Sequence, residues 1–375
     1  MGPVKVVDLF SGAGGLSLGA ARAGFEVSGA AELDSEAMSA HRINFPNALH
    51  MERDVSKLDG TALLAALGLR RGELAGLIGG PPCQGFSCIG KNHKDDPRNR
   101  LFIDFFRLVA ESRPKFFLAE NVPGILVGSG NERIRARALS HVEGRYTVLR
   151  PLMICASEYG VPTTRTRVFF IGYLRDELAP LHPEDFGPSV DVTAVCVRDA
   201  LRGLPLKIRQ EWQDEEDGWR VVRSYGSGPF ACRTRGHVPR GVGDPRALAR
   251  LRLESRASGC LGTVHSTLVA KRYSRVEPGT RDTISKSHRL ELHGFCPTLR
   301  AGTGPERGRF QAVRPLHPTE NRVITPREAA RLQGFPDWFQ FSPAKWHSFR
   351  QIGSSVSPIL AERILGVIRG ALGDT

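Results

Sequence analysis

The sequence lacks the features that mark membrane, secreted and zinc-ribbon proteins. No run approaches the ~18 consecutive apolar residues that a membrane span needs. The amino terminus has no apolar signal-peptide core. The seven cysteines are odd in number and include no Cys-x-x-Cys pair, which argues against a disulfide framework and against a structural zinc site. These absences favour a protein of the reducing cytoplasm without a metal.

Acidic residues are scarce relative to basic ones. The chain has 52 Lys and Arg against 39 Asp and Glu, and its formal net charge is +13. Residues 198–315 alone hold 23 Lys and Arg against 12 Asp and Glu, so +11 of the +13 lies there. A local excess of this size favours a polyanionic partner, most simply a nucleic-acid backbone. A basic surface that serves only solubility is the alternative.

The first half of the chain alternates short β-rich runs with helical stretches, which predicts an α/β fold with a doubly wound, mostly parallel sheet. The strands are expected at Val4–Phe10, Val27–Glu32, Leu49–Asp54, Leu74–Ile78, Lys115–Glu120, Tyr146–Leu149 and Val168–Tyr173. The helices between them are expected to include Leu16–Ala23, Ser35–Phe45, Thr61–Leu67 and Leu101–Ser112.

Regularity is lost after Leu174 and returns near the carboxyl terminus. Gly, Pro, Arg and Ser dominate the intervening segment, which predicts a smaller, irregular, basic domain. Thr325 and Glu328 have the spacing of a capping box, and a last helix is expected at about Pro358–Leu372. The predicted division is therefore 1–174, 175–320 and 321–375, the last segment returning to the first domain.

A glycine-rich turn, Asp8–Gly15, follows the first predicted strand. Glycines allow a tight bend and a close approach of backbone to a ligand. A dinucleotide fingerprint would need a third glycine where Ser17 stands, so NAD fits incompletely. Glu32 and Asp54, at the ends of the next two strands, could bind ribose hydroxyls and an adenine amino group. The pattern suits S-adenosylmethionine at least as well as NAD.

Cys83 stands in a Pro-Pro loop directly after the apolar run 74–78. Prolines fix the backbone, and ligands bind at the carboxyl ends of parallel strands. A thiol held there suggests a nucleophile, although a free cysteine is often simply buried. Glu120 ends the next strand and is expected to share the cleft, unless it only caps the strand.

Arg165 and Arg167 alternate at the entry to the last strand of the sheet, so they are expected on one face. Two guanidinium groups are costly to bury without an anionic or carbonyl partner. They therefore indicate either a substrate-binding pair or a buried ion-pair network.

Taken in order along the chain, these motifs resemble those of the DNA cytosine-5 methyltransferase family, of the bacterial or phage restriction-modification type. The resemblance covers roughly residues 4–173 and 316–365. The matching segments are Asp8–Gly15, Pro81–Gln84, Glu120–Val122, Tyr159–Pro162 followed by Arg165 and Arg167, Arg327–Asp337, and Gln351–Val356.

The resemblance implies an S-adenosylmethionine-dependent methyltransferase fold and a reaction. The Cys83 thiolate would attack C6 of a flipped-out cytosine within a short specific sequence of double-stranded DNA. Glu120 would bind the N3 and amino edge, and Arg167, helped by Arg165, would hold O2. C5 would take the methyl group, leaving S-adenosyl-L-homocysteine.

Further residues are assigned by the same resemblance. The cofactor-binding set is Phe10, Gly12, Gly14, Glu32, Leu33, Asp54, Val55, Pro82, Leu101, Ser355 and Val356. The DNA-binding set is Gln84, Ser87, Thr298 and Leu299. Three positions depart from the family pattern, namely Thr163, Ser354 and Ser357, but none is the nucleophile or Glu120, so an active enzyme is expected.

We expect a monomer that acts on nucleoid DNA, alone or beside a separate cognate restriction endonuclease. Methylation of RNA and a catalytically inactive DNA-binding homologue are the alternatives. A nicotinamide oxidoreductase is the weakest candidate.

Overall fold

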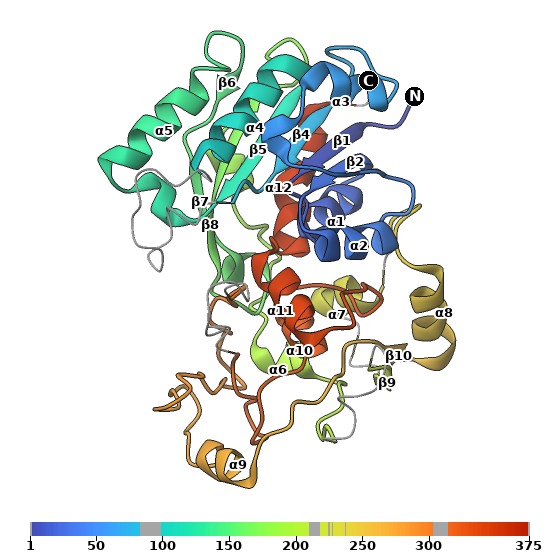
Figure 1. The fold of residues 1–375 in the computed structure, drawn as a ribbon, viewed down its shortest axis with the longest axis vertical. Coiled ribbons are helices and arrows are strands. Elements are labelled where there is room, and N and C mark those ends of the chain that lie inside the picture. Colours follow the sequence, from blue (N-terminus) through green and yellow to red (C-terminus); the bar gives the residue numbers. More distant parts are fainter. Residues whose placement is uncertain are drawn as a thin grey trace.

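A computed structural model of the 375-residue chain describes residues 2–82, 99–209, 218–223, 226, 228–236, 238–302 and 314–373. One large sheet and its helices form the upper lobe in Figure 1, and short helices joined by long connections form the lower lobe. Both chain ends lie at the top of the upper lobe. The chain therefore leaves this lobe once, builds the lower lobe, and returns.

Within the described residues, eight strands form the large sheet in the order β3-β2-β1-β4-β5-β8-β6, with β7 paired to β8. Strands β1 to β5 pair in parallel, whereas β8 is antiparallel to β5, β6 and β7. The order reverses between β1 and β4, and ligands bind outside such a switch point. The strands are β1 (Lys5–Leu9), β2 (Glu26–Glu32), β3 (Leu49–Glu52), β4 (Gly76–Gly79), β5 (Phe116–Asn121), β6 (Thr147–Val148), β7 (Leu152–Cys155) and β8 (Thr166–Tyr173).

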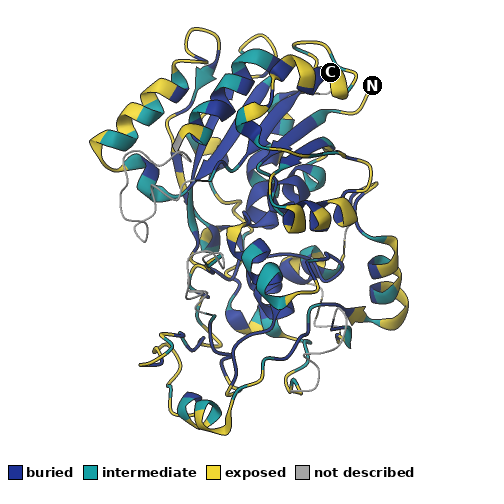
Figure 2. Cartoon of the chain, in the orientation of Figure 1, coloured by how far each residue is buried: buried dark blue, intermediate teal, exposed yellow. Residues whose placement is uncertain are grey.

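Side chains that alternate along each strand build two apolar layers, one on each face of the sheet. Phe116 and Leu118 join one core cluster, whereas Phe117 and Ala119 join the other. Figure 2 shows the strands buried between helices whose outer surfaces are exposed. The upper-lobe helices are α1 (Gly15–Arg22), α2 (Ser35–Asn44), α3 (Gly60–Ala66), α4 (Asn99–Ser112) and α5 (Ser129–Leu139), joined by α12 (Pro358–Ala371).

The expected elements and the observed ones agree closely in the upper lobe. Strand β3 ends at Glu52, two residues early, because Asp54 instead caps the 3-10 turn Val55–Lys57. Strand β7 was not predicted from the sequence: it has only four residues, directly after Pro151, and Met153 points outward with 65% of its surface exposed. Short edge strands carry little alternation to detect.

The lower lobe contains α6 (Val197–Leu201), α7 (Pro229–Arg235), α8 (Pro245–Glu254), α9 (Thr267–Tyr273), α10 (Pro326–Leu332) and α11 (Lys345–Ser354), with a short hairpin of β9 (Arg220–Val221) and β10 (Arg256–Ala257). The predicted capping box starts α10, since Thr325 Oγ1 accepts from Glu328 N and Glu328 Oε2 accepts from Thr325 N. None of the helices in the described ranges has the length and apolarity needed to cross a membrane.

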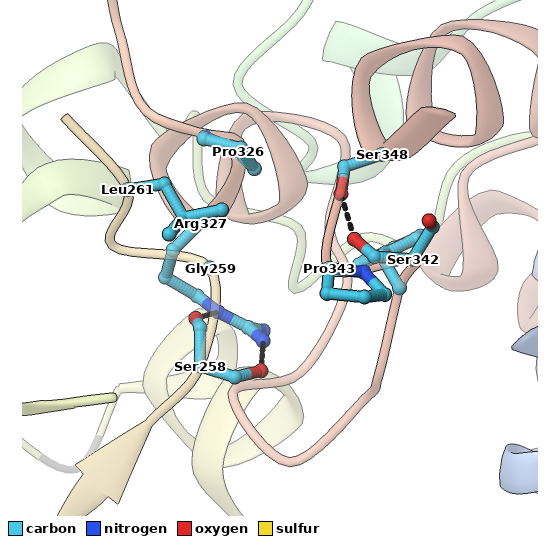
Figure 3. Close-up of a pocket in the computed structure, with 9 residues that line it drawn as sticks. Ser258, Gly259, Leu261, Pro326, Arg327, Ser342, Pro343 and Ser348 are labelled. Carbon is cyan, nitrogen blue, oxygen red and sulfur yellow. Dashed lines mark hydrogen bonds between the residues drawn. The ribbon is translucent and has the colours of Figure 1, made fainter. Parts of the chain in front are cut away.

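Charged side chains hold the core of the lower lobe together. Arg331 and Asp337 are both fully buried and form two contacts of 2.7 Å. Arg327 crosses from α10 to Ser258, donating to its carbonyl oxygen at 2.7 Å and to its hydroxyl at 3.1 Å (Figure 3). The cavity beside Arg327 measures only about 10 Å³, which is room for a single water. It is a packing gap rather than a ligand site.

Helix α12 packs directly on the backbone of α1. A Cβ on Gly19 would lie 2.2 Å from Ala361 Cβ and 2.7 Å from Glu362 N. A Cβ on Gly15 would lie 2.3 Å from Val356 O. Two glycines thus bring the last helix against the helix that follows the Asp8–Gly15 turn.

We predict opposite effects of the same substitution on these two helices. Gly19→Ala should lower the free energy of unfolding by about 1–3 kcal/mol, because the new methyl group overpacks the α1–α12 contact. Gly366→Ala on α12, where a Cβ meets no described atom within 4 Å, should raise it by about 0.5–1 kcal/mol. Urea unfolding of both variants checks this. Equal changes in the free energy of unfolding for the two variants would contradict the close contact between α1 and α12.

Candidate active site and cofactor site

The turn after β1 is open around one of its glycines and tightly packed around another. Phe10, Gly12 and Gly14 all have positive φ, at 59°, 56° and 103°. A Cβ on Gly12 would meet no described atom within 4 Å, whereas one on Gly14 would lie 2.4 Å from the ring of Phe45. Gly14 is therefore needed for packing on the end of α2, and Gly12 borders the open side.

Glu32 braces this turn from the end of β2. Its Oε2 accepts from Gly12 N, and its Oε1 accepts from the backbone N–H groups of Leu33 and Asp34, each at 2.9 Å. Burial raises the pKa of Glu32, and the three backbone donors oppose that shift. The carboxylate is thus fixed in orientation beside the open side of the turn. The neighbouring side chain of Leu33 is 67% exposed.

Asp54 follows β3, next along the sheet edge. Parallel pairing of β2 with β3 sets Glu32 beside Glu52, so the ends of these strands lie together. Asp54 Oδ1 accepts from Ser56 N at 3.0 Å and from Ser56 Oγ at 2.8 Å, and Val55 beside it is buried. The structure thus brings the predicted carboxylates of the cofactor set to one edge of the sheet.

The chain segment just before α12 closes the same region from the other side. Val356 O lies against Gly15, and Ser355 O accepts from Gln333 Nε2 at 2.8 Å. Ser355 and Val356, predicted for the cofactor pocket, are both buried behind the turn. Leu101 lies in the first turn of α4 and is half-buried.

The strand after the switch point leads to the predicted nucleophile. Strand β4 ends at Gly79, and Pro81 O lies 3.5 Å from Asn121 Nδ2. A Cβ on Gly80 would lie 3.1 Å from Glu120 Oε2. The loop therefore passes beside Glu120 as it approaches position 83. Cys83 itself, with Gln84 and Ser87, lies outside the described residues.

Glu120 and Arg167 face each other across the antiparallel β5–β8 pair. Arg167 Nε lies 2.7 Å from Glu120 Oε1, and their side chains retain only 12% and 10% exposure. The pair stands at the carboxyl end of β5, where the Pro81-Pro82 loop passes. The site therefore offers one carboxylate and one guanidinium, both oriented and nearly buried.

Comparison with known proteins decides the family. The model of the C-5 cytosine-specific DNA methylase family matches residues 4–370. The chain belongs to this family. The resemblance and the fold class predicted from the sequence are confirmed, and the protein is an enzyme that methylates DNA at cytosine C5.

Type II methyltransferases are among the proteins similar to this chain. The Type II methyltransferase M.XorII of Xanthomonas oryzae pv. oryzae is 38% identical over 372 residues, covering 98% of this chain and 84% of that protein. M.DdeI of Desulfomicrobium norvegicum is 31% identical over 389 residues, covering 96% and 87%. Both matches extend over the basic lower lobe as well as the sheet.

Similar solved structures are also methyltransferases. A candidate DNA modification methyltransferase encoded within an Escherichia coli prophage has a TM-score of 0.89 and 48% identity, covering 99% of this chain and all of that one. The Dnmt2 methyltransferase of S. pombe has a TM-score of 0.63 at 15% identity, covering 99% of each chain, which concerns the fold alone.

The two arginines predicted as a pair have different partners. Arg165 is buried and donates to Leu299 O at 3.2 Å and to Ser354 O at 3.3 Å. It thereby ties the entry of β8 to the chain returning from the lower lobe, while Arg167 contacts Glu120. Of the predicted DNA-binding residues, Thr298 is exposed, whereas Leu299 is buried.

A row of polar side chains beneath the turn was not predicted from the sequence. Ser17 Oγ lies 2.6 Å from Asp8 Oδ2 and 3.0 Å from His41 Nε2, and His41 Nδ1 lies 3.0 Å from His50 Nε2. Burial raises the pKa of Asp8 to about 7 and lowers that of His41. Ser17, which stands where a dinucleotide-binding motif would have its third glycine, was the one member of this row that the sequence analysis singled out.

A methyl group on Gly80 should disturb Glu120 without disturbing the fold. Gly80→Ala brings its Cβ to 3.1 Å from Glu120 Oε2, so the carboxylate must shift by a few tenths of an ångström. We expect kcat to fall about tenfold, because misplaced reacting groups are costly. Gly130→Ala on α5, where a Cβ meets no described atom within 4 Å, should keep the wild-type rate. Steady-state methylation and thermal unfolding of both variants check this, and an unchanged kcat for Gly80→Ala would contradict it.

Proposed function

We propose that the enzyme transfers a methyl group from S-adenosyl-L-methionine to C5 of a flipped-out cytosine within a short specific sequence of double-stranded DNA. The observation that carries the proposal is the Glu120–Arg167 pair at 2.7 Å, beside the loop that leads to Cys83. A stacked base cannot reach such a recessed pair, so the target must leave the helix, at a cost of a few kcal/mol.

In the proposed mechanism, Cys83 supplies the nucleophile and the pair binds the base. The Cys83 thiolate forms a bond to C6, which makes C5 electron-rich. Glu120 accepts a hydrogen bond from the exocyclic amino group, and Arg167 donates toward O2, so charge that develops on the ring is stabilised. After C5 is methylated, loss of its proton restores the 5,6 double bond and expels the thiolate.

The residues around the Asp8–Gly15 turn fit S-adenosylmethionine. A Cβ on Gly12 would meet no described atom within 4 Å, so a ligand could approach the backbone closely there, and the braced carboxylate of Glu32 suits ribose hydroxyls. Asp54 and Val55 would face the adenine. The remaining members of the proposed set are Phe10, Gly14, Leu33, Pro82, Leu101, Ser355 and Val356. The cofactor supplies an electrophilic methyl group and leaves as S-adenosyl-L-homocysteine.

We propose that residues 1–174 form the catalytic domain, 175–320 the target-recognition domain, and 321–375 the returning segment. The close α1–α12 contact and the hydrogen bonds of Arg165 support the proposal that the carboxyl-terminal segment packs back on the catalytic domain. The basic excess of the middle segment supports binding of phosphates there, with bases read in a groove. We propose a monomer that acts on nucleoid DNA in the cytoplasm, either alone or beside a separate cognate restriction endonuclease.

Incubation with unmethylated genomic DNA and S-adenosylmethionine, followed by base-resolution sequencing, tests the function. We expect 5-methylcytosine within one short motif. DNA carrying 5-fluorocytosine in that motif should give a denaturation-resistant protein–DNA adduct, because fluorine cannot leave C5 as a proton does. Methylation of RNA alone, or of another cytosine atom, would overturn the proposal.

A further inference from the structure

Residues 279–289 of the lower lobe form a short two-stranded projection, here called the finger. Gly279 N donates to Arg289 O and Arg289 N to Thr280 O, both at 2.9 Å. Beyond them, Arg281 bridges His288, and Asp282 N donates to Ser287 O at 2.8 Å. The finger follows α9 at the lower end of the molecule (Figure 1).

The tip of the finger is held in a fixed shape by Asp282, which is buried. Its Oδ2 accepts from Ser285 N at 2.6 Å and from Ser285 Oγ at 2.7 Å, and its Oδ1 accepts from Arg272 Nε of α9 at 2.9 Å. Lys286 takes a φ of 59°, and its Nζ donates to Thr283 O. The tip is therefore held by contacts within the finger and by one contact with α9.

The base of the finger is anchored by Arg289, which is 4% exposed. Its guanidinium donates to oxygen atoms of α9 and of the segment 317–321. The acceptors are Tyr273 O (2.6 Å), His317 O (3.0 Å), Asn321 Oδ1 (3.1 Å), Glu320 O (3.2 Å) and Pro318 O (3.4 Å). So many bonds to one cation make the finger a rigid extension of the lobe.

The finger presents an apolar side chain among cations. Ile284 at the tip is 70% exposed, and Arg281, Thr283 and Lys286 around it are exposed as well. Residues 271–289 contain six Lys and Arg against two Asp and Glu. The charge suits a phosphate backbone, and the isoleucine suits a thymine methyl group or another apolar base edge.

The chain after the finger connects it to the catalytic strands. Cys296 N donates to Pro162 O at 2.9 Å, and Thr164 N donates to Cys296 O at 3.0 Å. Leu299, which is three residues after Cys296, accepts a hydrogen bond from Arg165 through its carbonyl oxygen. Arg165 itself precedes Arg167 by two residues. A short, bonded path thus fixes the finger relative to the Glu120–Arg167 pair.

We propose that the finger enters a groove of the DNA substrate, where Ile284 contacts base edges and determines target specificity while Arg281 and Lys286 bind phosphates. The proposal rests on the proposed methylation of a short specific sequence. Contacts to phosphates position a protein without reading sequence, whereas contacts to base edges discriminate. Substitution of the base-reading residue Ile284 and substitution of a phosphate-binding residue should therefore have different effects on methylation and binding.

Methylation maps of genomic DNA distinguish them. Ile284→Ala should methylate sites that differ from the wild-type motif, and its preference for the motif over one-base variants should fall about tenfold. Leu253→Ala on α8 removes an apolar side chain that is 78% exposed, so it is the matched control and should keep the wild-type map. Lys286→Ala should bind all sequences more weakly and reduce the slope of log affinity against log salt by about one.

An unchanged map and preference for Ile284→Ala would overturn the assignment of the finger. Thermal unfolding should show Ile284→Ala to be as stable as the wild type, since the side chain is exposed. If the wild type itself makes no 5-methylcytosine, the proposed function fails instead. Selection of bound fragments from a random DNA pool then compares the wild type with Ile284→Ala directly, and equal selectivity would still count against the finger.

Discussion

Cys83→Ala is expected to abolish methylation, lowering the rate at least about 10⁴-fold, because it removes the thiol that is proposed to form the bond to C6. Affinity for DNA and for S-adenosylmethionine should remain within a few-fold of the wild type. Glu120, Arg167 and the Asp8–Gly15 turn are untouched by the substitution. Single-turnover methylation and equilibrium binding on the same DNA check both statements.

Cys88→Ala is the matched control for this prediction, since it removes a thiol five residues further along the same sequence segment. It should methylate DNA at close to the wild-type rate and form the adduct with 5-fluorocytosine. Activity retained by Cys83→Ala would contradict the covalent mechanism. Loss of activity in both variants would show that the segment, rather than the thiol, is what the reaction needs.

Arg331→Met is expected to lower the free energy of unfolding by about 3–5 kcal/mol, because it leaves the Asp337 carboxylate buried without its cation. Both side chains are fully buried, and Arg331 also donates to Ala200 O and Arg202 O. One guanidinium therefore joins α10 to the segment around α6. Urea unfolding measures the loss.

The double variant Arg331→Met with Asp337→Leu should recover much of that loss, because no isolated charge then remains buried. Arg150→Met provides the comparison on the surface, where the Arg150–Glu184 pair is 74% and 73% exposed. It should change stability by no more than about 1 kcal/mol. A small effect of Arg331→Met, similar to that of Arg150→Met, would contradict a structural role for the buried pair.

The sheet and its functional edge could be predicted because their signals are local. Apolar runs, glycines and strand-end carboxylates mark β1 to β5, and the same residues place Glu32, Asp54 and Glu120 at one edge. Family motifs then added residues such as Val356, which no local pattern connects to Gly15. The observed contact between them depends on chain segments more than 300 residues apart.

Other features could not be predicted because they depend on partners far away in sequence. Arg165 was expected to help Arg167 hold the base, and no pattern in the sequence indicated that it also donates to the carbonyl groups of Leu299 and Ser354. Those acceptors become available only once the returning chain is in place. Arg289 likewise looks like one more basic residue of the middle segment until its five oxygen partners surround it.

The row from Asp8 to His50 can carry its hydrogen bonds in either of two directions. With Asp8 ionised, His50 donates to His41, His41 to Ser17, and Ser17 to the carboxylate. With Asp8 protonated, every donor and acceptor exchanges roles, and the proton on His50 moves to its other nitrogen. Burial raises the pKa of Asp8 to about 7, so the charge of this carboxyl decides which direction the hydrogen bonds take. The half-buried imidazole of His50 on β3 is thereby connected, through His41 and Ser17, to the carboxyl of Asp8 below the turn.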